Sequence, residues 1–392
     1  MFMRVKEWIL TKISGARTLV ESLRRQAVTV VFGFPGGFNM PIYDALYDER
    51  SRSGKQIRHI LARHEQSAVH MADGYARASG TIAVCLATSG PGATNLLTGL
   101  ATAYHDSTPL VAITGQVPTF SVGSDAFQEA DIIGMAASVT KYSFQPLNVK
   151  EILPVIRRAF HLAASSPPKP VLVDLPRNVQ TDEDEIDWET DSGPHEHPVA
   201  PSAKITEPSA KAEPEAVESH LTGAINLLGP LLPPNALVTA DVPFTYTARQ
   251  GDQVEHKRAI GSNLATMGFG FPAALGAKVA KPQTPVIAIQ DNMGFLMTEN
   301  SLATSLEEQI PITVVVLSKT VPWKAAMLQK RYKDKWNSGI KTTHQTPNIM
   351  KLAESYGARG VHAETLEALG NAITKSIKSS VTTVVDGVNV KF

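Results

Sequence analysis

The chain has 392 residues, more than one hydrophobic core usually organises, so two globular domains are expected. Lysine plus arginine and aspartate plus glutamate both number 37, and this balance excludes an overall field that would attract nucleic acid or an anionic membrane. No continuous apolar stretch approaches the ~20 residues that span a bilayer, and the single cysteine excludes an internal disulfide, so we expect a cytoplasmic protein.

Short apolar segments alternate with longer stretches of helical period in the first part of the chain. The segments predicted as strands are 29–33, 57–61, 82–87, 110–114 and 170–175. This alternation predicts βαβ units, and therefore a doubly wound parallel sheet with helices on both faces. We assign residues 1–180 to this first α/β domain.

The composition then changes to the acidic run 182–185 and a mixture of Pro, Ala, Ser and Lys without apolar period. We therefore assign 181–218 to a solvated linker. The alternation resumes in 219–392, which predicts a second doubly wound parallel α/β domain. Its expected strands are 236–240, 285–289, 312–317 and 382–386, and its expected helices include 271–279 and 348–356.

Two glycine-rich loops follow predicted strands of the first domain, at 34–39 and 88–95. Glycines there allow a ligand to approach the backbone closely, although a tight turn alone also explains them. Neither loop has the G-x-G-x-x-G spacing, so a nicotinamide dinucleotide is not favoured. A third segment, 63–66, places the carboxylate of Glu65 at the start of a helix, where it either complements the helix dipole or takes part in chemistry.

Residues 31–180 resemble the pyrimidine-binding domain of acetolactate synthase, a thiamine diphosphate-dependent family. The motifs that carry the resemblance are Phe32-Gly33-Phe34-Pro35-Gly36-Gly37, Arg63-His64-Glu65-Gln66 and the segments 87–95, 113–118 and 125–129. The resemblance implies that Glu65 would hydrogen-bond N1′ of the cofactor's aminopyrimidine ring as an acid/base. It also implies that Gly36, Gln128 and Lys141 would line the substrate side of the same cleft.

The second domain is similar to the diphosphate-binding domain of that family in the segments 266–277 and 351–357. By this resemblance, Met267 would be the wedge that keeps the cofactor bent. The family's arrangement implies a homodimer or homotetramer in which the pyrimidine site of one subunit meets the diphosphate site of its partner.

Several departures from the family pattern fall on the diphosphate side. The metal-binding Gly-Asp-Gly turn aligns with Asp291-Asn292-Met293, and the later Asn-Asn pair aligns with Ser318-Lys319. Asn292 and Lys319 would then replace the metal ligands, which disfavours Mg²⁺ because a protonated lysine has no lone pair to donate. Trp323, next to Lys324, replaces a glycine where a phosphate oxygen would meet the backbone. The linker leaves no room for the family's FAD-carrying middle domain, so FAD is not expected.

Three hypotheses on function follow. The first is an acetolactate synthase-like enzyme, a carbon–carbon bond lyase or transferase that has become cofactor-independent and takes a small oxo-acid-like substrate in the inter-subunit cleft. Glu65 would be its acid/base, and Lys319 or Lys324 its anion anchor or amine nucleophile. The second is a decarboxylase or carboligase of 2-oxo acids that binds thiamine diphosphate without metal. The third is a non-catalytic subunit or scaffold.

Overall fold

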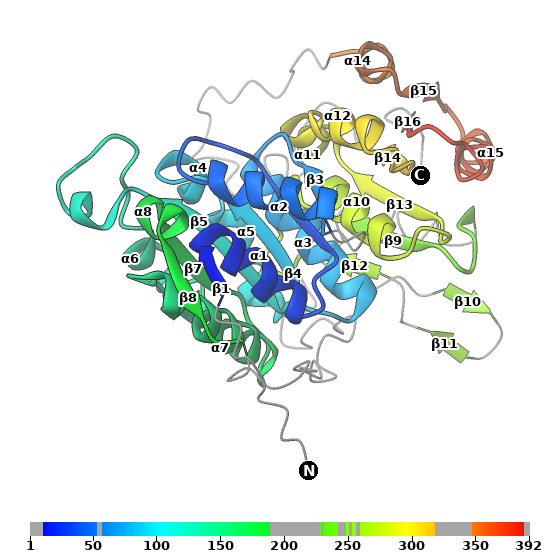
Figure 1. The fold of residues 1–392 in the computed structure, drawn as a ribbon. Coiled ribbons are helices and arrows are strands. Elements are labelled where there is room, and N and C mark those ends of the chain that lie inside the picture. The colour runs from blue at the N-terminus through cyan, green and yellow to red at the C-terminus, as the bar shows by residue number, and fades with distance from the viewer. Residues whose placement is uncertain are drawn as a thin grey trace, which may run out of the picture.

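The computed structural model describes residues 11–52, 57–188, 228, 231–241, 248–250, 253–255, 259–317 and 347–387. Within them the chain forms two α/β domains, each built on a six-stranded parallel sheet (Figure 1). The strand order is β3-β2-β4-β5-β7-β6 in the first domain and β12-β9-β13-β14-β16-β15 in the second. The predicted fold class is confirmed.

The first domain follows the predicted alternation. Its sheet strands are β2 (Val30–Gly33), β3 (Arg58–Leu61), β4 (Ala83–Ala87), β5 (Leu110–Gln116), β6 (Tyr142–Phe144) and β7 (Val171–Pro176). Its helices are α1 (Gly15–Arg25), α2 (Met40–Arg52), α3 (Glu65–Ser79), α4 (Pro91–Thr94), α5 (Leu97–Asp106), α6 (Ile132–Ala136), α7 (Ile152–Ala164) and α8 (Arg177–Thr181). The strands β4, β5 and β7 are buried throughout, as expected for central strands covered on both faces.

The second domain repeats this plan. Its sheet strands are β9 (Leu237–Ala240), β12 (Ala259–Gly261), β13 (Val286–Gln290), β14 (Thr313–Val316), β15 (Arg359–His362) and β16 (Thr383–Asp386). Its helices are α10 (Gly270–Ala280), α11 (Asn292–Thr298), α12 (Ser301–Glu307), α14 (Ile349–Tyr356) and α15 (Leu366–Ser376). A separate antiparallel pair joins β10 (Ala248–Gln250) to β11 (Gln253–Glu255).

The acidic run expected to open the linker belongs instead to the first domain. Residues Glu183–Ile186 form β8, which pairs antiparallel with β1 (Thr11–Ser14). Ile186 is buried, and the guanidinium of Arg25 lies 4.7 Å from the ring centroid of Trp188. The acidic side chains dominate the composition of this segment, but these two apolar residues fix it to the domain.

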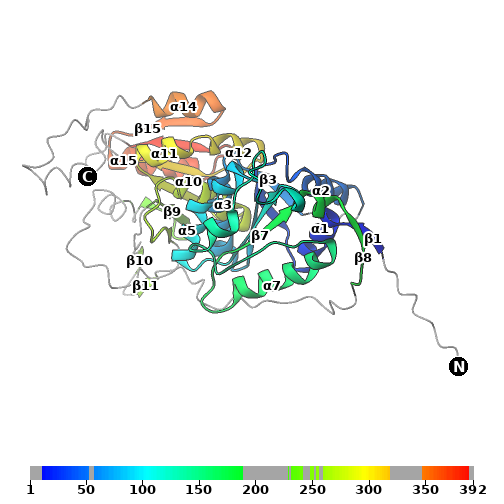
Figure 2. The ribbon, with the colours of Figure 1, turned by 90° about the vertical axis from the view of Figure 1, so that its left-hand side faces the viewer.

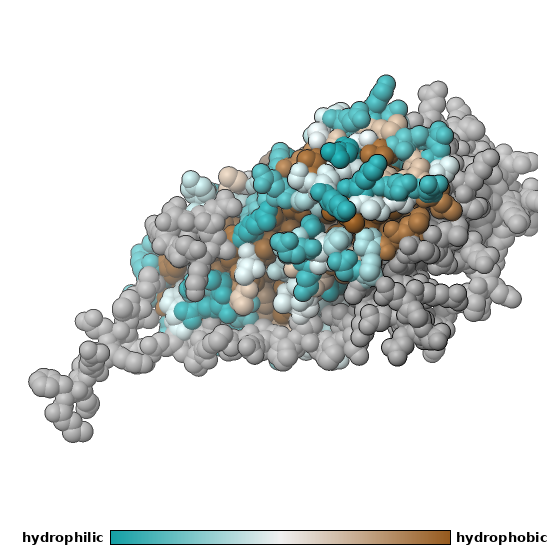
Figure 3. All heavy atoms as spheres, turned by 90° about the vertical axis from the view of Figure 1, so that its right-hand side faces the viewer, coloured by the Kyte–Doolittle hydropathy of each residue, from teal (hydrophilic) through white to brown (hydrophobic). Residues whose placement is uncertain are grey.

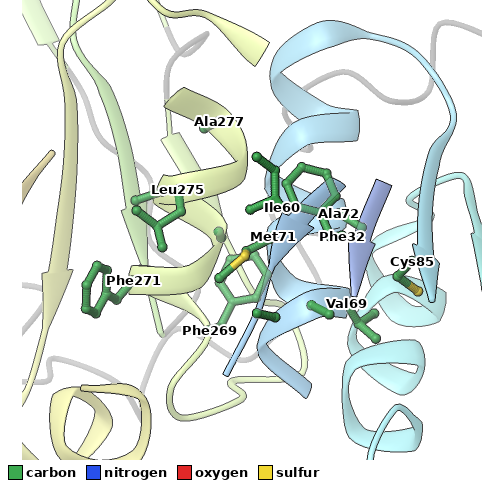
Figure 4. Packing of buried hydrophobic residues seen from close by; sticks show 14 of the residues in the cluster. Phe32, Ile60, Val69, Met71, Ala72, Cys85, Phe269, Phe271, Leu275 and Ala277 are labelled. Atoms are coloured by element: carbon green, nitrogen blue, oxygen red, sulfur yellow. The ribbon is translucent and has the colours of Figure 1, made fainter. Parts of the chain in front are cut away.

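The two domains pack against each other through α3 and α10, which lie side by side in Figures 1 and 2. One hydrophobic cluster includes residues of both domains, and Figure 4 shows Met71 of α3 and Phe269 at the start of α10 within it. Backbone meets backbone at this crossing. A Cβ on Gly74 would lie 2.6 Å from the carbonyl carbon of Ala273, and one on Gly276 would lie 2.6 Å from that of Met71.

The surface of the described residues mixes polar and apolar side chains, as the face in Figure 3 shows. Among the helices in the described parts of the chain, none has the length and apolar character needed to cross a membrane.

Candidate functional site

Glu65 begins α3 just beyond the carboxyl end of β3, at the edge of the sheet where ligands of parallel α/β domains bind. The helix starts there because His64 is extended and its Nδ1 accepts a hydrogen bond from the amide of Gln66 at 3.1 Å. Glu65 is only 8% exposed. The amide of Asn95 donates to its Oε2 at 3.0 Å.

Both glycine-rich loops meet beside this carboxylate. A Cβ on Gly36 or on Gly92 would lie 2.6 Å from the methyl carbon of Thr88, and one on Gly92 would also lie 3.2 Å from Oε1 of Glu65. The amide of Phe38 donates to the hydroxyl of Thr88 at 3.1 Å, which ties the two loops together. Glycine is therefore required by close packing, and the structure brings Gly36 and Glu65 into one site.

Gln128 approaches the same loops from the segment after β5. Its φ is +59°, and a Cβ on Gly90 would lie 2.6 Å from its carbonyl oxygen. The amide of Gln116 holds the base of this segment, because Nε2 donates to the carbonyl of Ala130 at 3.0 Å and to Oδ2 of Asp174 at 2.9 Å. The structure thus places the backbone of Gln128 against the loop that carries Asn95.

Asp174 is a buried polar residue of β7 that the sequence reasoning missed. Besides Gln116, its carboxylate accepts hydrogen bonds from the hydroxyl of Thr114 at 2.7 Å and the amide of Gln145 at 2.8 Å. Burial raises the pKa of Asp174 to about 6. A charged residue inside an otherwise apolar strand was the signal for it.

Lys141 lies apart from this cluster. It directly precedes β6, at the amino end of the parallel strands, whereas Glu65 follows the carboxyl end of β3. Its ammonium donates to the carbonyl and the hydroxyl of Ser165, at 2.7 and 2.6 Å, and to the carbonyl of Pro167 at 3.1 Å. Burial lowers the pKa of Lys141. Within this chain Lys141 is therefore not brought together with Glu65, and it anchors the loop between α7 and β7.

The second domain presents Met267 and Asn292. Met267 is partly exposed, in the loop that leads into α10, and the next residue, Gly268, has a φ of +81°. Asn292 is the first residue of α11 and is buried. The preceding Asp291 caps that helix, because its Oδ1 accepts a hydrogen bond from the amide of Gly294 at 2.6 Å.

The remaining predicted site residues, Lys319, Trp323 and Lys324, lie outside the described residues. Across the described ranges, no cluster of three or more His, Cys, Asp or Glu side chains could hold a metal ion. At the start of α11 the described part of the second domain therefore presents the neutral amide of Asn292, while the carboxylate of Asp291 caps the helix.

A buried ion network fixes the Met267 loop to the first domain. Arg77 of α3 pairs with Asp73 at 2.6 Å and with Asp106 at 2.5 Å, and it donates to the carbonyl of Gly261 at 2.8 Å. Asp106 in turn accepts from the amide of Asn263 at 2.9 Å. The two Asp carboxylates raise the pKa of Arg77 against the effect of its burial, so the guanidinium stays charged. The helix that begins at Glu65 thus also holds the second-domain loop.

Family models match both halves of the chain. Residues 13–135 match the thiamine pyrophosphate enzyme, N-terminal TPP binding domain, and residues 245–387 match the C-terminal TPP binding domain. Residues 136–244 lie outside both matches.

The chain is also similar to curated acetolactate synthases. It is 52% identical to the "Acetolactate synthase" of Arthrospira platensis over 177 residues, which cover 45% of this chain and 30% of that protein. It is 29% identical to the "Acetolactate synthase isozyme 2 large subunit" of Escherichia coli over 527 positions, covering 94% of each chain. That alignment is longer than the 392 residues of this chain, so the relative contains positions without a counterpart here.

Among solved structures, the fold is similar to that of a Rhodococcus jostii RHA1 thiamine diphosphate-dependent 4-hydroxybenzoylformate decarboxylase. The TM-score is 0.76 at 16% identity, covering 97% of this chain and 100% of that one. At this identity the likeness supports the fold alone.

Proposed function

Because this chain belongs to the thiamine pyrophosphate enzyme family, we propose that it is a thiamine diphosphate-dependent enzyme that makes or breaks the carbon–carbon bond next to the carbonyl group of a 2-oxo acid. Both halves match models of TPP binding domains, and the curated relatives are acetolactate synthases. These matches do not support the expectation of a cofactor-independent protein, which is therefore no longer the leading hypothesis.

The observation that carries the proposal is the setting of Glu65. Asn95 holds Oε2, while Oε1 faces the side-chain-free backbone of Gly92. This arrangement fits the edge of an aminopyrimidine ring, which needs a carboxyl group held in place to hydrogen-bond its N1′ atom. When bound, thiamine diphosphate supplies a carbon nucleophile that adds to a carbonyl and accepts the electron pair released by the broken bond.

The residues of this chain have separate tasks in that reaction. Glu65 holds a proton on Oε1 or releases it, and its burial keeps water from competing for that proton. Asn95 orients the carboxyl group through Oε2. Gly36 and Gly92 let both loops pack closely around Thr88 beside Glu65, and Met267 would contact the cofactor from the second domain.

The second domain motivates a finer proposal, that the diphosphate binds without a tightly held Mg²⁺. Asn292 replaces the expected ligand carboxylate, and Asp291 already caps α11. The sequence offers Lys319 as the positive charge instead. An opposite unit charge at ~4 Å contributes roughly 4 kcal/mol at an effective dielectric of 20, before desolvation.

Calorimetry on the full chain tests both statements. We expect thiamine diphosphate to bind with similar affinity in Mg²⁺ and in EDTA. In an activity assay, we expect Glu65→Gln to abolish turnover of pyruvate or another 2-oxo acid. The exposed Glu354→Gln on α14 is the matched control and should keep full activity. Absence of binding at millimolar cofactor in both buffers contradicts the cofactor proposal, and binding only with Mg²⁺ contradicts the metal-free one.

The replacement of the expected metal ligands by Asn292 and Lys319 motivates one second candidate, the repurposed enzyme that takes a small oxo-acid-like substrate without cofactor. Glu65 would remain the acid/base, and Lys319 or Lys324 would anchor an anion or form a Schiff base. Turnover without thiamine diphosphate, together with borohydride trapping on one lysine, would identify this candidate. A Glu65→Gln variant that leaves every activity of the assembly unchanged would point to the scaffold hypothesis.

A homodimer or homotetramer with a shared cleft stays part of the proposal. In the described chain, α3 and α10 pack within one subunit. Light scattering gives the number of subunits. Mixing Glu65→Gln chains with chains altered at Met267 shows whether one site takes residues from two subunits, because activity is restored only if it does.

A further inference from the structure

Asp241 is a buried carboxylate that the site as described so far does not use. It directly follows β9, at the carboxyl end of the second sheet, and is 3% exposed. Its Oδ1 accepts hydrogen bonds from the amide of Gly270 at 2.6 Å and from Nε2 of Gln290 at 2.8 Å. Its Oδ2 accepts from the amide of Gly268 at 2.9 Å. All three donors are neutral, and a carboxylate is buried at high cost without such partners.

These donors belong to different elements of the candidate site. Gly268 and Gly270 flank the turn between Met267 and α10, and Gln290 ends β13 directly before the cap of α11. The backbone amides of Gly268 and Gly270 both donate hydrogen bonds to this one carboxyl group. Asp241 therefore fixes the backbone on the C-terminal side of Met267 to the ends of β9 and β13.

The first turn of α11 rests on the same carboxyl group. A Cβ on Gly294 would lie 3.1 Å from Cγ of Asp241 and 3.2 Å from Oδ1 of Asp291, and it would be closer still to Oδ2 of Asp241. The helix that begins at Asn292 can approach Asp241 only because residue 294 has no side chain. One carboxyl group thus sets the separation between the Met267 loop and the start of α11.

We propose that Asp241 is a positioning residue, which holds Met267 and the start of α11 in register through the amides of Gly268 and Gly270 and through contact with Gly294. This inference rests on the proposed function. Asp241 itself does not touch the reacting atoms. Its effect comes through the placement of two groups that face the ligand, and displacement of such groups by ~1 Å can cost about 10²-fold in rate.

Two substitutions of Asp241 together separate positioning from charge and size. Asp241→Asn keeps the shape but turns an NH₂ group towards one of the donors, so at least one amide of the Met267 loop loses its acceptor. Asp241→Glu keeps the charge but adds a methylene, which forces the Gly294 turn away. We expect either change to loosen the loop and the start of α11 together.

The matched control is Thr382→Val, at the opposite, amino edge of the second sheet. Thr382 is buried and accepts a hydrogen bond from the amide of Ile312 at 3.1 Å, so its loss destabilises the same domain without touching the site. Hydrogen exchange of the full-length chain supplies a readout that does not depend on activity. The peptides that contain residues 262–270 and 292–298 report on the two segments that Asp241 joins.

For Asp241→Asn, we expect faster exchange confined to those peptides and a loss of about 10²-fold in kcat with a change of less than threefold in KM for the 2-oxo acid. Thr382→Val should raise exchange throughout the domain and leave kcat of the folded fraction unchanged. Unchanged exchange at 262–270 in Asp241→Asn, or the same domain-wide pattern as Thr382→Val, would overturn the proposal. If the unaltered chain has no activity, the proposed function fails, and the exchange pattern alone then decides the role of Asp241.

Discussion

Gly74→Ala on α3 is the substitution whose effect on the free energy of unfolding depends most directly on the packing of the two domains. In an exposed helix, replacing glycine by alanine stabilises by about 1 kcal/mol, because the unfolded chain loses freedom and the helix gains a better former. At Gly74 the added Cβ would lie 2.6 Å from the carbonyl carbon of Ala273 and 2.8 Å from its Cα. The two effects oppose each other.

The geometry decides which effect prevails. Carbon atoms in contact lie ~3.5–4.0 Å apart, so α3 and α10 must separate by about 1 Å. The obstructing atoms are backbone of a buried helix and cannot move away by a change of rotamer. Overpacking of this kind costs roughly 1–3 kcal/mol, and separation also weakens the layer of apolar side chains between the helices. We expect a net loss of about 2 kcal/mol in the free energy of unfolding.

Urea denaturation followed by circular dichroism measures this change. Gly370→Ala on α15 is the matched control, since its Cβ would meet only the flexible side chain of Leu231, at 3.1 Å. It should be neutral or stabilising by up to about 1 kcal/mol. A Gly74→Ala chain as stable as the unaltered one would refute the close backbone contact between the domains.

Three further outcomes are expected. Burial lowers the pKa of His70 to about 3 from its ordinary 6.5, so the unfolded chain binds the proton first and the stability present above pH 6.5 is lost as the pH falls. Relative to His70→Gln, the unaltered chain should lose about 2 kcal/mol of unfolding free energy at pH 5. Parallel curves of unfolding free energy against pH for the two chains would contradict this. Replacing the buried Arg77 by Met leaves Asp73 and Asp106 uncompensated and should cost about 3–5 kcal/mol of unfolding free energy, whereas a loss under 1 kcal/mol would show that the network is solvated. Gly36→Ala places a Cβ against Thr88 and should weaken binding of thiamine diphosphate at least tenfold in calorimetry, and unchanged affinity would separate this loop from the ligand.

The buried parallel strands were the elements most open to prediction from sequence. β5 and β13 each begin with four consecutive apolar residues and are buried throughout, and such runs bounded by turn residues have few other interpretations in an α/β chain. β6 and β12 have only three residues each and were not predicted. Their place is set by pairing with longer neighbours, β7 and β9, and a hydrophobic pattern over three residues does not contain that information.

The same limit explains why one half of the site was easier to predict than the other. Gly36 and Glu65 follow the carboxyl ends of strands, and all such ends share one edge of a parallel sheet, so their meeting follows from the strand assignment. Lys141 precedes the unpredicted β6, and without that strand nothing in the sequence distinguishes the two edges for it. Asp241 also follows a predicted strand, but many polar residues do. Its importance arises from Gly268 and Gly294, which are distant in sequence and converge on one carboxyl group only after the second sheet has formed.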